Sequence, residues 1–360
     1  MSLEVPLNIF CVSTPLQFLN AIEACHALSS LSTGSVLFVL AKHPEHMNTW
    51  LCVQQLHDLP FTEVHLVALD NVSLSAGVWK VFQSFWGNRV RATGLAARYL
   101  ECSRFFVGNP RTREHIYLAS LFPNAKITIL DDGTGTVSFF EKVQVHGGKA
   151  AAADFVSGGL IPWLKECCFR LFYGAYRKPL SKADFFTTHA LEAEAAGYDA
   201  VKNNYDWLAS TMRVRPRHKG THFLGAPFVE RGELPWEVYL AWLQSALRSL
   251  PAPVTYVAHW AESDEFLGRL ESELGISCVR FERPYELEFL LGDQEPACVA
   301  SWFSSALDVL SSVSGHQARL IAVEVPFNDF LKADIAASAR AFYERHRVRP
   351  RGVEVIRWMV

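Results

Sequence analysis

The chain has 360 residues, of which 50% are hydrophobic and 20% charged, enough for two globular domains with separate cores. A formal net charge of -3 argues against a nucleic-acid partner. Eight cysteines without a Cys-x-x-Cys pair exclude a zinc knuckle and indicate reduced thiols. With no signal-peptide pattern and no apolar run of membrane-spanning length, the sequence predicts a cytoplasmic protein.

Strands and helices are expected to alternate through a first domain, residues 1–146. Short apolar or β-branched runs mark the strands, and apolar residues at helical spacing mark the segments between them. This alternation predicts a right-handed parallel sheet. Pro15 fits the first turn of a helix that Ser13 or Thr14 caps. The strands are predicted at 7–12, 36–40, 64–69, 104–108 and 127–130, and the helices at 16–28, 46–57, 76–101 and 111–122.

The last of these strands runs directly into Asp131, Asp132 and Gly133. A buried parallel strand that ends in two carboxylates and a tight turn presents them at the sheet edge where ligands bind. An Asp-Asp-Gly turn also occurs for purely conformational reasons. The hydroxyls of Ser13 and Thr14, which follow the first strand, are expected near the same cleft and favour the functional interpretation.

The remaining chain is expected to form three parts. Residues 147–216 predict a mostly helical connector with a short strand at 183–187, 217–335 a second α/β domain, and 336–360 a basic C-terminal helix or tail. Aromatic and basic residues alternate in the connector and in the tail. Both patterns leave open either a solvated helix or a peripheral contact with an anionic membrane face.

Four polar residues of the second domain suggest a nucleotide site. Ser304 and Ser305 open an amphipathic helix, whose free amides and dipole favour a phosphate, although N-capping alone explains one serine. His259 ends a strand and could hydrogen-bond or protonate a leaving phosphate, although a lone histidine is more often a packing residue. Glu288, in a helical stretch, could accept ribose hydroxyls, although exposed helix carboxylates are common.

The general base is expected to be a carboxylate from one of the two domains. Gly225 ends the strand after the connector, and Glu230 follows on the next loop. Glu230 and Asp132 are both candidates to deprotonate an acceptor hydroxyl. The chain has no Asp-x-Asp of the kind that holds a divalent metal on a sugar nucleotide, so no metal is expected.

Six segments between residues 7 and 312 carry a family resemblance. They are LNIFCVSTPLQFLNAIEA, IYLASLFPNAKITILDDGTGT, FLGAPFVERG, VTYVAHW, RPYELEF and WFSSALDVL. With these segments in family order, the chain resembles the bacterial sialyltransferases of glycosyltransferase family 52, the lipooligosaccharide sialyltransferases, and is more distantly similar to bacterial polysialyltransferases. In such enzymes an acidic-acidic-Gly turn, a His-Pro pair and a Ser-Ser or Ser-Thr pair mark the active site. The second motif departs here, because Trp260 follows His259.

The resemblance implies an α/β fold with two Rossmann-like domains facing a cleft, the GT-B type of glycosyltransferase. It implies inverting, metal-independent transfer of sialic acid from CMP-sialic acid to a galactoside on a lipid-linked glycan, lipooligosaccharide, with no cofactor. The N-terminal domain would take the acceptor and the C-terminal domain CMP. His259, Ser304 and Ser305 would hold the phosphate, Glu288 the ribose, and Glu230, ahead of Asp132, would be the base.

Two alternatives to this function stay open. The chain could be a non-catalytic nucleotide-binding protein of the same fold. It could also be a related glycosyltransferase that uses CMP-Kdo or a UDP- or GDP-hexose. The sequence also leaves a homodimer open.

Overall fold

The computed structural model describes most of the chain in two compact units, Met1–Asn203 and Asn204–Val360. The described residues are 6–28, 33–42, 46–71, 78–99, 101–133, 136–137, 139–140, 143, 182–211, 215–313, 316–348 and 352–357. The predicted helices between residues 147 and 181 lie outside these ranges. Within the described ranges, no helix combines the length and the apolar character needed to cross a membrane.

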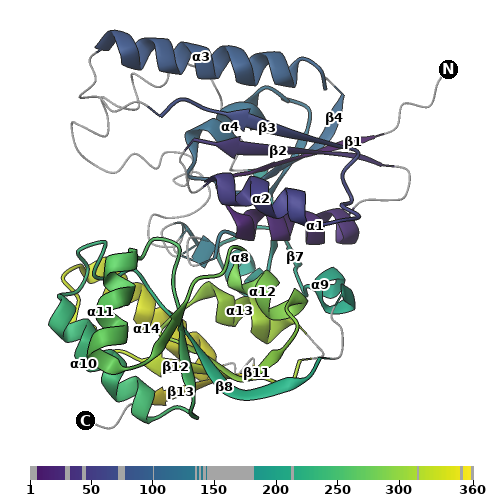
Figure 1. The fold of residues 1–360 in the computed structure, drawn as a ribbon. Helices are drawn as coiled ribbons and strands as arrows, with labels where there is room; N and C mark the ends of the chain where they lie inside the picture. Colours follow the sequence, from purple (N-terminus) through teal and green to yellow (C-terminus); the bar gives the residue numbers. More distant parts are fainter. Residues whose placement is uncertain are drawn as a thin grey trace. The chain divides into compact units, whose positions relative to one another are not determined.

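The first unit is built on a seven-stranded parallel sheet in the order β3-β2-β1-β4-β5-β6-β7 (Figure 1). Its strands are β1 (Leu7–Val12), β2 (Gly34–Ala41), β3 (Glu63–Ala68), β4 (Cys102–Val107), β5 (Lys126–Leu130), β6 (Asp184–Thr187) and β7 (Ala200–Lys202). Its helices are α1 (Pro15–Leu28), α2 (Met47–Gln55), α3 (Val78–Ala96), α4 (Arg113–Ser120) and α8 (Ala190–Ala195). The strand order reverses between β1 and β4, the place where open α/β sheets bind ligands.

Helices cover both faces of this first sheet. Alternate residues of a strand point to opposite faces, so Ile9 packs into the core shared with α3 and α4. Phe10 points to the other face, where it stacks on Phe106 at a ring-centroid distance of 4.1 Å. Figure 1 shows α1 and α2 on that face and α3 on the opposite one.

The second unit is a six-stranded parallel sheet in the order β10-β9-β8-β11-β12-β13. Its strands are β8 (Arg217–Leu224), β9 (Val254–Val257), β10 (Ser277–Val279), β11 (Glu295–Ser301), β12 (Arg319–Glu324) and β13 (Val353–Arg357). Its helices are α9 (Asp206–Thr211), α10 (Trp236–Arg248), α11 (Asp264–Leu274), α12 (Tyr285–Leu291), α13 (Ser305–Ser312) and α14 (Ala333–Val348), with a 3-10 turn, η4 (Phe327–Asp329). Here the order reverses between β8 and β11, so Gly225 and Ser304 follow the two strands that flank the reversal.

The unit boundaries differ from the predicted domain boundaries at two places. Strand β6, expected inside a connector, pairs with β5, and Asp184 accepts a hydrogen bond from Thr128 on the neighbouring strand. The basic tail is also part of a sheet, since β13 pairs with β12. Arg347 and Arg357 both form ion pairs with Glu324, so these two tail arginines are engaged inside the second unit.

Candidate functional site

In the first unit, Asp132 is held by one donor on each carboxylate oxygen. Gln17 Nε2 donates to Oδ1 at 2.6 Å, and Asn109 Nδ2 donates to Oδ2 at 2.5 Å. The backbone N–H of Asp132 donates to Thr136 Oγ1 at 2.7 Å. These residues follow β1, β4 and β5, so the carboxylate lies beside the reversal of the strand order.

Each of the two amides has its orientation fixed by a second partner. Gln17 Oε1 accepts from the backbone N–H of Ser13 at 2.8 Å, and Asn109 Oδ1 accepts from the backbone N–H of Arg111 at 2.7 Å. Their amide nitrogens therefore face Asp132. A Cβ at Gly108 would lie 2.5 Å from Gln17 Oε1, so only glycine leaves room for this arrangement.

Burial raises the pKa of Asp132 to about 6, against the opposing effects of Gln17, Arg111 and Asn109. A carboxylate with a pKa close to neutrality is better matched to proton abstraction than an ordinary aspartate. The environment of Asp132 therefore suits a general base.

Ser13 and His115 form a buried pair that resembles a nucleophilic dyad, with 2.8 Å between Ser13 Oγ and His115 Nε2. The backbone N–H of Asn109 donates to His115 Nδ1 at 3.2 Å, so the proton of the neutral ring lies on Nε2. Burial lowers the pKa of His115 to about 3. His115 is thus a hydrogen-bond donor to Ser13, and the hydroxyl of Ser13 is not activated as a nucleophile.

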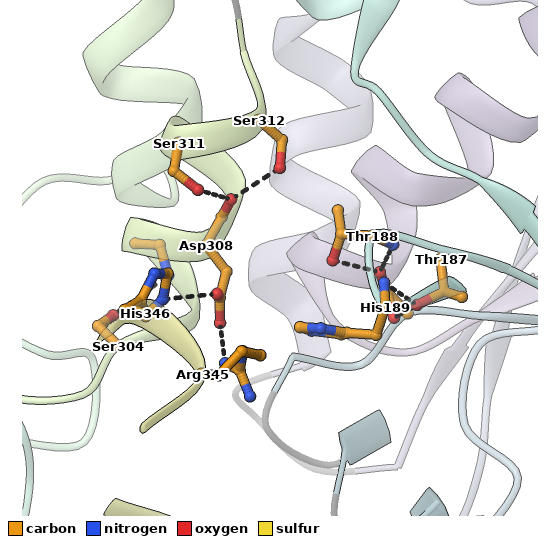
Figure 2. Close-up of polar contacts among 11 residues, drawn as sticks. Thr187, Thr188, His189, Ser304, Asp308, Ser311, Ser312, Arg345 and His346 are labelled. Carbon is orange, nitrogen blue, oxygen red and sulfur yellow. Dashed lines mark hydrogen bonds and ion pairs between the residues drawn. The ribbon is translucent and has the colours of Figure 1, made fainter. Parts of the chain in front are cut away.

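Asp131 links β5 to the segment after β6. Its Oδ1 accepts from Thr187 Oγ1 at 2.5 Å, and its Oδ2 accepts from the backbone N–H of Thr188 at 2.7 Å. Asn20 Nδ2 donates to its carbonyl oxygen at 3.1 Å. Figure 2 shows Thr187 and Thr188 beside His189 in this cluster. These contacts make Asp131 a support of the turn that carries Asp132.

The remaining predicted residues of the first unit shape the same edge. Thr14 caps α1, because the backbone N–H of Gln17 donates to its Oγ1 at 3.3 Å. Gly133 has a φ of 62°, a left-handed conformation that glycine adopts without strain.

In the second unit, Gly225 allows a close approach between strand ends. A Cβ at this position would lie 2.7 Å from Glu262 Oε2 and would also overlap the Tyr256 hydroxyl. The backbone after β8 therefore touches the residues that follow β9. Any larger residue at 225 would displace this contact.

The turn that carries His259 is closed by Glu262. The backbone N–H of His259 donates to Glu262 Oε2 at 2.7 Å, and the backbone N–H of Glu262 donates to the His259 carbonyl at 3.0 Å. Arg280 donates to the carbonyl oxygens of both residues, at 3.2 and 2.7 Å. Trp260, at the position where the family that the sequence resembles has proline, is 55% exposed, and its ring centroid lies 5.2 Å from that of His259.

The ring of His259 has a defined tautomer. The backbone N–H of Ala261 donates to Nδ1 at 3.1 Å, which leaves the proton of the neutral ring on Nε2. Burial, together with the charges of Arg231 and Arg280, lowers the pKa of His259 to about 4. In the free protein His259 is therefore a neutral N–H donor at pH 7, suited to hydrogen-bond an anion.

A buried chain of hydroxyls extends from Glu262 into the core. Tyr256 donates to Glu262 Oε1 at 2.6 Å, the hydroxyls of Tyr256 and Tyr239 are 2.7 Å apart, and Trp302 Nε1 donates to Tyr239 at 3.4 Å. Burial raises the pKa of Glu262 to about 7. The chain thus connects the segments after β9 and β11 through a carboxyl group that titrates near neutrality.

The N-terminus of α13 carries the serine pair. Ser304 caps the helix, since its Oγ accepts from the backbone N–H of Ala306 at 3.2 Å. Among the described residues, none hydrogen-bonds the side chain of Ser305. One serine is thus occupied by capping, and the hydroxyl of the other can bind a phosphate oxygen together with the helix amides.

An ion-pair cluster fixes α13 to α14. Asp308 accepts from Arg345 Nη2 at 2.9 Å and from His346 Nε2 at 3.0 Å, as Figure 2 shows. The side chains of all three residues are at most 10% exposed. This buried anchor holds the position of the helix whose N-terminus presents Ser305.

The two predicted glutamates of the second unit have less suitable environments. Glu230 is exposed, and hydrogen bonds from Ser263, the N-cap of α11, lower its pKa. Glu288 Oε2 accepts from Arg283 Nε at 3.1 Å and Nη2 at 2.8 Å. Its carboxylate is therefore paired with a guanidinium before any ribose is bound.

The two parallel sheets with their reversals, together with the structural matches that follow, show a fold of the GT-B class. The chain is similar to spinosyn forosaminyltransferase, at 13% identity and a TM-score of 0.51 over 97% of this chain and 85% of that one. A UDP-glucosyltransferase from Polygonum tinctorium matches at 13% identity and 0.52, over 98% and 85%. A protein assigned as a UDP-N-acetylglucosamine 2-epimerase from Listeria monocytogenes matches at 10% and 0.54, over 97% and 92%.

The sequence comparisons do not assign the chain to a family. No protein-family model matches the chain, and none of the curated proteins matches it. At such low identities the structural matches establish the fold and leave the reaction to be argued from the site.

Proposed function

We propose that this protein is an inverting glycosyltransferase that moves sialic acid from CMP-sialic acid to a galactoside, on a lipooligosaccharide. The observation that carries the proposal is that the two strand reversals hold different kinds of chemical group. The reversal in the second unit gathers neutral N–H and O–H donors, and the one in the first unit holds a carboxylate with a raised pKa.

The second unit suits a single phosphate. His259 and Ser305 follow β9 and β11, which flank β8, so their loops are separated by two strand spacings, or about 10 Å. CMP carries one phosphate and is already a good leaving group. Hydroxyls, an imidazole N–H and the N-terminus of α13 can stabilise the charge that develops on it without a metal.

The first unit supplies the base in this proposal. Asp132 takes the proton of the acceptor hydroxyl as the acceptor oxygen bonds to the anomeric carbon of sialic acid. The bond from that carbon to the phosphate breaks at the same time, and CMP leaves with the bonding electrons. One displacement inverts the anomeric configuration.

The two candidate bases differ in pKa, which favours Asp132. Burial raises the pKa of Asp132, while the Ser263 hydrogen bonds lower that of exposed Glu230. A base with a depressed pKa removes a hydroxyl proton less effectively. We therefore assign the base to Asp132, and Glu230 accepts from the backbone N–H of Ser263 at the start of α11.

Metal independence is part of the proposal. Within the described ranges, no group of three or more histidine, cysteine, aspartate or glutamate side chains is placed to hold a metal ion. Turnover should be unchanged after incubation with EDTA, because hydroxyls, an imidazole N–H and helix amides hold the phosphate in this proposal.

A different activated sugar is the second candidate. Two of the similar structures are named for enzymes of UDP-sugars, one of them an epimerase. The same helix terminus would bind a diphosphate, so the choice of nucleotide decides between the two candidates.

A thermal-shift panel of nucleotides tests the proposed donor. CMP is expected to raise the melting temperature more than UMP, UDP or GDP, with a stabilisation of about 2.7 kcal/mol at 100 times its Kd. The double variant Ser304→Ala, Ser305→Ala should lose affinity for CMP and keep its weaker affinity for cytidine. A larger shift with UDP than with CMP would reject the cytidylate donor.

A further inference from the structure

Helix α3 carries a row of aromatic side chains along its exposed side. The rings of Trp79 and Phe82 are stacked with centroids 5.6 Å apart, and those of Phe82 and Trp86 with centroids 6.3 Å apart. Trp79 is 69% exposed and Trp86 51%, and Val90 continues the row at 55%. From Trp79 to Val90 the row is about 16 Å long at 1.5 Å per helical residue.

The opposite side of α3 supplies the contacts of this helix with its domain. Val81, Ser84, Asn88, Ala92 and Ala96 are buried, and they recur at spacings of three to four residues. Ala92 and Ala96 belong to the core that covers the first sheet. The aromatic row is therefore not needed to attach α3, and its exposure to water requires another explanation.

The charged residues of α3 itself are all basic. Residues 78–96 contain Lys80, Arg89 and Arg91 and no acidic residue, in a chain whose acidic residues outnumber its basic ones by 37 to 34. The guanidinium of Arg89 lies 5.4 Å from the ring centroid of Trp86, and Arg91 pairs with Asp70 at 2.6 Å. The row is thus an apolar surface with a local positive bias.

We propose that this side of α3 is a docking surface for an anionic lipid bilayer. Tryptophan favours the boundary between acyl chains and headgroups, and lysine and arginine beside it attract acidic headgroups. The helix lies along the membrane surface in this arrangement, with Trp79, Phe82 and Trp86 at the level of the headgroups.

The charges on α3 favour a membrane over the other partners that could cover this surface. In a symmetric dimer through α3, Lys80 and Arg89 of one copy would meet the same basic side of the other, with no carboxylate in the helix to compensate. Of the two basic segments noted in the sequence, the aromatic part of the connector lies outside the described residues, and the tail has Arg347 and Arg357 paired with Glu324. The α3 surface therefore has the better complement to negatively charged lipid.

Co-sedimentation of the full chain with vesicles tests the proposal. Vesicles of phosphatidylcholine with roughly 30 mol% phosphatidylglycerol are compared with vesicles of phosphatidylcholine alone, because anionic headgroups attract lysine and arginine near the surface. We expect binding to the anionic vesicles, weakened by salt, and a loss of about tenfold or more in the double variant Trp79→Gln, Trp86→Gln. Lys80→Gln, Arg89→Gln should remove most of the preference for anionic vesicles.

The matched control changes two exposed leucines elsewhere, Leu191→Gln and Leu331→Gln, which are 51% and 66% exposed. This variant should bind vesicles as the wild type does. Wild-type protein that stays in the supernatant, or tryptophan variants that bind as well as the control, would overturn the proposal. So would a dimer in analytical ultracentrifugation that the tryptophan variants dissociate. The inference is independent of the proposed reaction, because transfer to a soluble acceptor should be the same in all these variants.

Discussion

Asp132→Asn is expected to lower sialyl transfer by about 10²- to 10⁴-fold, because the variant has no base for the acceptor hydroxyl. Glu230→Gln is the matched control and should keep near-normal turnover. Initial rates with saturating CMP-sialic acid and a galactoside measure both. The reverse result, with Glu230→Gln inactive and Asp132→Asn active, would assign the base to the second unit.

The pH dependence of the wild type and of Asp132→Asn provides an independent readout. Burial raises the pKa of Asp132 from 3.8 to about 6, so the folded state favours the protonated carboxyl. The contribution of Asp132 to the free energy of unfolding of the wild type therefore falls as the pH rises from about 4 to 6. Turnover rises as the pH approaches and passes about 6, because the carboxyl group then loses its proton and can act as a base. As the pH is raised from 4 to 7, the free energy of unfolding of Asp132→Asn should increase relative to that of the wild type. Denaturant unfolding at each pH measures this difference.

Glu262→Ala is expected to reduce both stability and turnover, whereas Glu262→Gln should preserve most of each. Alanine leaves the buried N–H of His259 and hydroxyl of Tyr256 without their acceptor, at a cost of about 2–4 kcal/mol in the free energy of unfolding. Without this contact the Nε2 donor of His259 loses its position, and turnover should fall about 10²- to 10³-fold.

Glutamine mimics the protonated form of Glu262. Its carbonyl accepts from the His259 N–H, and its amide donates to Tyr256, whose own hydroxyl then turns toward Tyr239. Denaturant unfolding and initial rates check the pair of variants. Equal turnover in Glu262→Ala and wild type would show that the turn is held by other contacts, such as those of Arg280.

Local sequence signals predicted the order of the elements and most of their positions. Apolar runs located the strands because a buried parallel strand needs apolar residues on both faces. The start of a helix was visible where capping chemistry is local, as at Thr14 of α1. The two-domain α/β fold of GT-B type followed from this alternation and the family resemblance, and the structural comparisons support it.

The supports of the site could not be predicted in this way. Ser13 and His115 are 102 positions apart, and Gln17 and Asp132 are 115 apart, so no local pattern links them. The turn at His259 needs no proline because Glu262 folds back onto it. That contact requires Tyr256 in the core and a glycine at 225.

That the end of the predicted connector belongs to the first sheet could not be seen in the sequence for a similar reason. Strand β6 has only four residues, and its place in the first sheet depends on pairing with β5. Strand pairing between distant segments is a tertiary property, and the sequence carries only a weak local sign of it.

Release of CMP from CMP-sialic acid by the purified protein, with and without a galactoside, tests the proposed function most directly. We predict acceptor-dependent release, with sialic acid appearing on the galactoside in inverted configuration and at an unchanged rate in EDTA. A protein that binds CMP tightly and releases none with any galactoside offered, or that transfers a sugar only from a UDP donor, would contradict the proposal.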